Sequence, residues 1–162
     1  MNKKYFWSAF ILGFLLALYI SYSTVKSFFE PEVDIFKIQY VSVGKMSYTL
    51  EKNYSKVRLI SFWATWCMPC VKEFSAFQKM KEKYPEALEI IAVSDENPNK
   101  IIEFVAKNKY DFNFLISSKD FDSIGISARP VNVIIDRRGN TLLFKVGMLT
   151  DNEIETALKL EK

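Results

Sequence analysis

The chain alternates between short, continuous apolar runs and longer segments with helical spacing. Residues 57–63, 88–93 and 131–135 have the length and the β-branched and aromatic content of buried strands. A further short apolar run covers residues 112–116. Runs of this kind predict a sheet that is covered on both faces.

Helical spacing follows several of these runs. A first helix is expected over residues 68–84 and ends before Pro85. A second begins at Pro98, which suits the first helical position, a third is capped by Asp151, and residues 121–124 suggest a single turn. The apolar positions expected to face the core are Val71, Phe74, Phe77 and Met80 in the first helix, Ile101, Ile102, Phe104 and Val105 in the second, and Ile154, Leu158 and Leu160 in the third.

A hairpin is expected on each side of this alternating region. Residues 35–43 and 45–50 have β-rich sequence around Gly44, which indicates an N-terminal hairpin or two short strands. Residues 141–146 return after a tight turn at residues 137–140 and pair with the preceding strand. The order of elements predicts an α/β protein with a mixed sheet and helices on both faces.

The N-terminal segment has no charge over the 21 residues 5–25. A helix of that length spans about 31 Å, close to the thickness of the bilayer hydrocarbon, and aromatic residues stand at both of its ends. Lys3 and Lys4 precede it, which predicts a cytoplasmic N-terminus and an exported remainder. An uncleaved membrane anchor is therefore expected, with the domain periplasmic or on the outer face of the cell membrane.

A cleaved signal peptide is the alternative, with residues 6–20 as its apolar region and Ser21-Tyr22-Ser23 as its cleavage site. Both alternatives export the same domain. A buried helix of a soluble domain is disfavoured because the segment has no polar face. The expected organisation is an anchor or signal segment at residues 1–25, a linker at 26–34 and one domain at 35–162.

Composition narrows the possible chemistry. The chain has 162 residues, 49% of them apolar, which excludes low-complexity disorder and collagen. The net charge is +3, of which Lys3 and Lys4 supply two, so no nucleic-acid partner is expected. The absence of histidine excludes serine–histidine and cysteine–histidine catalysis, and two cysteines cannot form a four-cysteine zinc site. No cofactor and no metal are expected.

The two cysteines form the sequence Cys67-Met68-Pro69-Cys70, where a buried strand passes into a helix. The positive end of the helix dipole lowers the pKa of a thiol at this position. Cys67 is therefore the expected attacking thiolate and Cys70, one turn further on, the resolving thiol. A purely structural disulfide is disfavoured because it would close a very short loop.

Residues 61–70, with the sequence SFWATWCMPC, resemble the active-site stretch of thioredoxin-fold proteins. With Glu73 following, the stretch is similar to the membrane-anchored ResA/TlpA branch, which includes cytochrome c maturation reductases. Arg129-Pro130 matches the cis-proline loop of that family, and the resemblance covers roughly residues 40–160. Further matches are Asp136 at a strand end, Gly139 at the hairpin turn and Gly147 near the active site.

The resemblance implies a thioredoxin-like mixed sheet flanked by helices, with an N-terminal β extension and an N-terminal transmembrane helix. It also implies that Glu73 is partly buried near the thiols and relays protons, the alternative being a surface glutamate at a helix start. Thioredoxins carry a buried aspartate where this chain has Ser61, and this difference shifts the proton-acceptor role toward Glu73.

A cis bond before Pro130 would place the backbone of Arg129 beside the cysteines, where a substrate peptide could pair with it as an added strand. The Arg129 side chain either favours the Cys67 thiolate by its charge or faces solvent. Trp63 is expected in the core. The expected substrate-binding residues are Trp66 as a partly exposed cover, Met68, Pro69, Arg129 and Pro130. Val131 and Asn132 stand where the family has small hydroxyl residues, which leaves the substrate open.

Met68-Pro69 supplies no charge and no side-chain donor to stabilise a thiolate, which favours a reductant over an oxidant. The predicted function is reduction of disulfides in exported proteins such as apocytochrome c before haem attachment. The expected partners are such protein substrates and a membrane electron donor of the thiol-reducing type. The alternatives are a general disulfide oxidase or isomerase and a non-enzymatic binding module.

Overall fold

The computed structural model describes residues 7, 11–22, 34–44 and 46–161. The chain divides into two units, Met1–Glu32 and Val33–Lys162.

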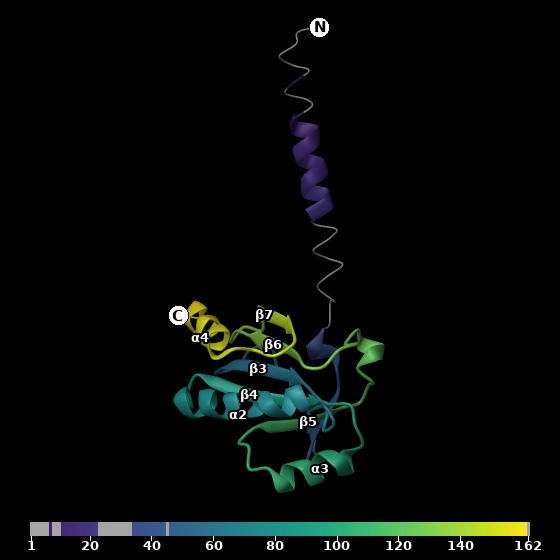
Figure 1. Ribbon diagram of the computed structural model, residues 1–162, viewed down its shortest axis with the longest axis vertical. Helices are drawn as coiled ribbons and strands as arrows, with labels where there is room; N and C mark the ends of the chain where they lie inside the picture. The colour runs from purple at the N-terminus through teal and green to yellow at the C-terminus, as the bar shows by residue number, and fades with distance from the viewer. Residues whose placement is uncertain (1–6, 8–10, 23–33, 45, 162) are drawn as a thin grey trace. The chain divides into compact units, whose positions relative to one another are not determined.

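Within the first unit, residues 11–22 are helical (Figure 1, purple). No helix among the described residues is long and apolar enough to cross a membrane. Lys3, Lys4, Ser23 and, apart from Asp34, the linker expected at 26–34 lie outside the described residues.

The second unit is built on one seven-stranded mixed sheet with the order β2-β1-β5-β4-β3-β6-β7 (Figure 1). Strands β3, β4 and β5 are parallel, whereas β1, β6 and β7 run antiparallel to their neighbours. The elements are η1 (Ile35–Lys37), β1 (Tyr40–Ser42), β2 (Ser47–Tyr48), β3 (Val57–Phe62), α2 (Met68–Lys83), β4 (Leu88–Ser94), α3 (Pro98–Lys107), β5 (Asn113–Ser117), η2 (Asp122–Ile124), β6 (Val131–Ile135), β7 (Thr141–Val146) and α4 (Asp151–Leu160).

The central strands are those that the apolar runs predict. Every residue of β3, β4 and β6 is buried, because each strand has a neighbour on both sides and packed side chains on both faces. The mixed α/β sheet expected from the sequence is therefore confirmed.

The expectation of helices on both faces is confirmed only for short 3-10 helices, because α2, α3 and α4 all lie on one face. Side chains of α2, α3 and α4 share one core cluster, in which Phe74 of α2 and Phe104 of α3 lie with their ring centroids 6.2 Å apart. The opposite face is covered by the short helices η1 and η2 and by loop residues such as Leu50 and Ile126. The connections β3-α2-β4 and β4-α3-β5 advance in the same direction across the sheet, so their right-handed crossovers place both helices on the same side.

The N-terminal β extension is present as the hairpin of β1 and β2, which adds to the sheet through β1 and β5. Its first part differs from the expectation of a strand. The Asp34 carboxylate accepts a hydrogen bond from the Phe36 N–H, which starts a 3-10 turn and places Ile35 in the core.

The cap of α4 also differs from the expectation. Thr150, not Asp151, is the N-cap: its hydroxyl accepts from the Glu153 N–H, and the Glu153 carboxylate accepts from the Thr150 N–H. This capping box satisfies two amide groups that a helix start leaves unpaired. Leu160, which was expected to face the core, is exposed, because it does not lie on the side of α4 that Ile154 and Ala157 turn toward the core.

Gly139 tests how tightly the β6–β7 turn packs against η1 and the loop after β2. Its φ is +86°, and an added Cβ would lie 3.1 Å from the Phe36 ring and 3.2 Å from the Cα of Lys52. We expect Gly139→Ala to lower the free energy of unfolding by at least about 1–2 kcal/mol, measured by urea denaturation. Gly44→Ala is the control, because the nearest atom to its added Cβ is 3.8 Å away. Equal effects of the two substitutions would contradict this account of the turn.

Candidate active site

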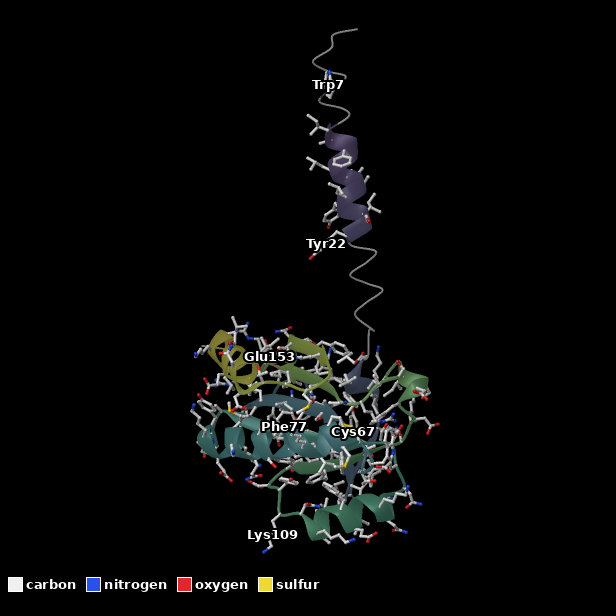
Figure 2. The ribbon with its side chains drawn as sticks, in the orientation of Figure 1. Trp7, Tyr22, Cys67, Phe77, Lys109 and Glu153 are labelled. Atoms are coloured by element: carbon white, nitrogen blue, oxygen red, sulfur yellow. A yellow bond between two sulfur atoms is a disulfide. The ribbon has the colours of Figure 1, made fainter. Side chains whose placement is uncertain are left out.

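The disulfide lies at the point where β3 passes into α2. Cys67 is the N-cap residue of α2, with extended backbone, and its Sγ accepts a hydrogen bond from the Cys70 N–H at 3.3 Å. Its Sγ is bonded to that of Cys70, and the two Cα atoms are 5.3 Å apart. Figure 2 shows Cys67 at the end of α2, with Phe77 further along the same helix. In the reduced protein, backbone N–H groups at the start of α2, such as that of Cys70, and the helix dipole stabilise a Cys67 thiolate.

The two sulfur-bearing residues differ in their surroundings. Cys70 is completely buried, and Cys67 is almost so. The neighbours of Cys67 are open to solvent, since Trp66 is 64% exposed and Met68 is 74% exposed. Trp63 lies in the core as expected, with its ring centroid 5.0 Å from that of Phe74. The accessible side of the disulfide is therefore bordered by large apolar side chains.

Glu73 lies inside the protein, one helical turn after Cys70. Its side chain is 1% exposed, and its Oε1 accepts a hydrogen bond from Asn132 Nδ2 at 2.7 Å. Burial raises the pKa of Glu73 to about 7, against the opposing effects of the Asn132 hydrogen bond, a Leu149 backbone hydrogen bond and the Lys145 charge. The alternative of a surface glutamate is wrong, because Phe74 and Phe77 turn this face of α2 toward the sheet.

Ser61 is completely buried and pairs in register with Asn132 across β3 and β6. These two strands therefore bring a hydroxyl and an amide, but no carboxylate, to the position facing α2. Glu73 supplies the carboxyl group from the helix side instead.

Arg129 precedes Pro130 through a cis peptide bond, as the family resemblance implies. Its Nη2 donates to both carboxylate oxygens of Asp95, at 3.0 and 2.8 Å. The guanidinium lies over the rings of Trp66 and Phe121, 5.4 and 4.8 Å from their centroids. The side chain does not face solvent, so that alternative is wrong, and its charge is paired with Asp95.

Two carboxylates that the sequence analysis did not single out hold the surrounding loops. Asp95 binds Arg129 of the cis-proline loop, and Glu96 accepts hydrogen bonds from the Thr65 N–H at 2.5 Å and the Thr65 hydroxyl at 3.0 Å. Thr65 lies in the loop that leads to Cys67. A sequence signal existed, since both acids directly follow the buried strand β4, whose carboxyl end lies beside that of β3.

A third segment joins these loops. The Gly147 N–H donates to the Pro130 carbonyl at 2.8 Å, and the flanking Val146 and Met148 are exposed. The loop before α2, the cis-proline loop and the end of β7 thus meet through the Trp66–Arg129 and Pro130–Gly147 contacts. Within the described part of the chain, no group of three or more histidine, cysteine, aspartate or glutamate residues is placed to hold a metal ion.

Comparison with known proteins agrees with this geometry. Residues 34–141 match the model of the AhpC/TSA family. The chain belongs to the AhpC/TSA family. It is 31% identical to the thioredoxin-like protein YneN of Bacillus subtilis, with 99% of this chain and all of YneN aligned.

Two further comparisons define the type of protein. The thiol-disulfide oxidoreductase ResA of Halalkalibacterium halodurans is 24% identical, with 99% of this chain and 97% of ResA aligned. The crystal structure of StoA from Bacillus subtilis shares the fold, with a TM-score of 0.61 at 20% identity over 76% of this chain and 97% of StoA. The predicted ResA/TlpA-type thioredoxin-like protein is confirmed, and the chain is a thiol-disulfide oxidoreductase.

Burial of Glu73 should make the stability of the oxidised protein depend on pH. The unfolded chain releases this proton near the ordinary pKa of 4.5, whereas the folded protein holds it until about pH 7. Stability contributed by the neutral acid is therefore complete below pH 4.5 and is lost as the pH rises to about 7. We expect Glu73→Gln to remove this loss, which amounts to about 3 kcal/mol, in urea unfolding between pH 4 and 8. Glu82→Gln, on the exposed side of the same helix, is the control. Parallel stability curves for wild type and Glu73→Gln would show that the carboxyl group is ionised in the folded protein.

Proposed function

We propose that this protein is a membrane-anchored, extracytoplasmic disulfide reductase that acts on exported proteins, apocytochrome c before haem attachment among them. Cys67 is the attacking thiolate, Cys70 the resolving thiol and Glu73 the group that exchanges protons with Cys70. Trp66, Met68, Pro69, Arg129 and Pro130 receive the substrate.

The reaction proceeds by two exchanges. The Cys67 thiolate attacks one sulfur of the substrate disulfide, and the other substrate sulfur leaves as a thiolate that takes a proton from water. Cys70 then gives its proton to the Glu73 carboxylate and attacks the Sγ of Cys67, which breaks the mixed disulfide. The second substrate sulfur leaves as a thiolate and takes the proton that Glu73 received, so the Glu73 carboxylate is restored. The substrate gains two electrons and two protons, and the protein ends with the Cys67–Cys70 disulfide. A thiol-reducing membrane donor restores the dithiol.

The direction of the reaction follows from the charges around the dithiol, and this observation carries the proposal. A disulfide is a strong oxidant when its reduced form is stabilised. The start of α2 favours a Cys67 thiolate, but the guanidinium of Arg129, which lies over the adjacent Trp66, adds little to this effect because it is paired with Asp95. Glu73 lies on the same face of α2 as Cys70. When Glu73 is ionised, its negative charge disfavours a thiolate on Cys70. The reduced form is therefore reactive, as a reductant requires.

Substrate recognition uses an apolar surface around the disulfide. Trp66 and Met68 flank Cys67, and Val146 and Met148 flank Gly147 on the adjoining segment. An extended peptide can place side chains on this surface while its backbone pairs with that of Arg129 as an added strand. Such recognition depends on unfolded polypeptide, which is the state of a cytochrome before its haem is attached.

The export of the domain is proposed from the sequence of the N-terminal unit. The 21 uncharged residues at 5–25, preceded by Lys3 and Lys4, favour an anchor with a cytoplasmic N-terminus. An anchor would keep the domain beside a membrane donor in a compartment where thiols are otherwise oxidised.

Trapping the mixed disulfide tests the exchange mechanism. The full chain with Cys70→Ser, mixed with an oxidised peptide that contains Cys-x-x-Cys-His, should form a covalent adduct through Cys67, detected by intact mass. Cys67→Ser is the matched control and should form none, because Cys70 is buried. The reduced wild type should convert the peptide to its dithiol. An equilibrium that favours the peptide disulfide would support the oxidase alternative instead.

Whole-cell labelling tests the location. A membrane-impermeant maleimide should label Cys67 of the reduced full chain in intact cells, and the protein should stay in the membrane pellet after carbonate extraction. In a Cys67→Ser, Cys70→Ser background, Asn2→Cys should be labelled only after permeabilisation. A soluble product that lacks its first residues would show a cleaved signal peptide, and labelling of Cys67 only in broken cells would refute export.

A further inference from the structure

Asn132 is an exception within its strand. It is the second residue of β6, between Val131 and Val133, and it is completely buried. A buried amide is costly unless its hydrogen bonds are replaced inside the protein. The Nδ2 group of Asn132 has partners on α2 and in the segment after β7, whereas its buried Oδ1 has no hydrogen-bond partner among the described residues.

The partners are the carboxyl group and a backbone carbonyl of the active site. Asn132 Nδ2 donates one hydrogen bond to Glu73 Oε1 at 2.7 Å and one to the Gly147 carbonyl at 3.0 Å. Glu73 lies on the disulfide-bearing helix α2, and Gly147 lies beside the exposed Val146 and Met148. One amide group thus joins the buried acid to the segment that borders the disulfide.

The hydrogen bond from Asn132 restricts which carboxyl oxygen of Glu73 can carry the proton. An amide NH₂ group only donates hydrogen bonds, so Glu73 Oε1 must accept in both its charged and its neutral state. The exchangeable proton of the neutral acid is therefore carried on Oε2. Donation also favours the carboxylate over the acid and so opposes the effect of burial.

We propose that Asn132 is a positioning residue for proton exchange: it holds Glu73 Oε1, directs the exchangeable proton to Oε2, and couples this site to the Gly147 segment. This inference rests on the proposed proton-exchange role of Glu73 in resolving the mixed disulfide.

Other groups act on Glu73 and enter the test. Lys145 of β7 lies in register with Asn132 and favours the carboxylate, but its Nζ is paired with Glu153 of α4 at 2.6 Å. From α2 itself, the neighbouring titratable group in the reduced protein is the thiol of Cys70. The test therefore alters Asn132 while leaving these groups in place.

The experiment follows the reaction of the reduced full chain with 5,5′-dithiobis(2-nitrobenzoate) by stopped flow. Attack by Cys67 releases one thionitrobenzoate, and resolution by Cys70 releases the second, whose rate is measured against pH. Asn132→Leu, close to asparagine in size, removes the donor, and Asn132→Asp replaces the amide by a carboxyl group that competes with Glu73 for one proton. Each should move the midpoint of the second phase to higher pH by about one unit or more. Val133→Ala, in the same strand but in the core cluster of the opposite face, is the matched control and should leave the midpoint unchanged.

Glu73→Gln separates the two hypotheses. If the rate of the second phase loses its pH midpoint in Glu73→Gln, but the midpoint does not shift in either Asn132 variant, the role of Asn132 is overturned and that of Glu73 stands. Persistence of the midpoint in Glu73→Gln would overturn the proton-exchange role of Glu73. Asn132→Leu combined with Glu73→Gln should behave as Glu73→Gln.

A measurement on the unmodified protein covers the case in which the variants do not fold. In nuclear magnetic resonance spectra of the full chain in detergent micelles, an Asn132 side-chain amide proton should shift with pH at the same midpoint as the Glu73 carboxyl carbon. An amide signal that stays constant through the Glu73 titration would contradict the proposal.

Discussion

A buried carboxyl group one helical turn from a disulfide is the constraint on which the other features of this site depend. Phe74 and Phe77 pack against the sheet and set the rotation of α2, so Glu73 enters the interior with them. Burial disfavours its charge and places its pKa at about 7, where a proton is easily exchanged. The hydrogen bond from Asn132 in the central strand β6 then becomes necessary, although an aliphatic residue would otherwise fit that position.

A second set of charges holds the loops around the disulfide. Asp95 and Glu96 follow β4 and bind the cis-proline loop and the loop before α2, respectively. Because Arg129 is committed to Asp95, its charge is compensated, and the accessible surface beside Cys67 is mainly apolar. The same ion pair therefore joins the cis-proline loop to the end of β4 beside the disulfide.

Much of the fold could be predicted from local pattern. The apolar runs located β3, β4 and β6, and the spacing of Phe74 and Phe77 located the buried face of α2. The placement of α2, α3 and α4 on one face depends on strand order, which local pattern does not encode. The Thr150–Glu153 capping box was present in the sequence as a threonine followed three residues later by a glutamate, and it was missed in favour of Asp151.

The partners of site residues were the least predictable part. Arg129 and Asp95 are far apart in sequence, as are Glu73 and Asn132, and each pair meets only because of the sheet register. The sequence marked Asn132 only as a departure from the family. Its contact with Glu73 required the antiparallel pairing of β6 with β3 and the packing of α2 over them.

The reduction potential of the Cys67–Cys70 pair in the full chain, measured at pH 7 by equilibration with dithiothreitol buffers, tests the central claim most directly. A protein whose dithiol lacks a stabilising charge should have a potential near or below that of thioredoxin, about −270 mV. A value near about −120 mV, as in strong oxidants, would contradict the reductant account.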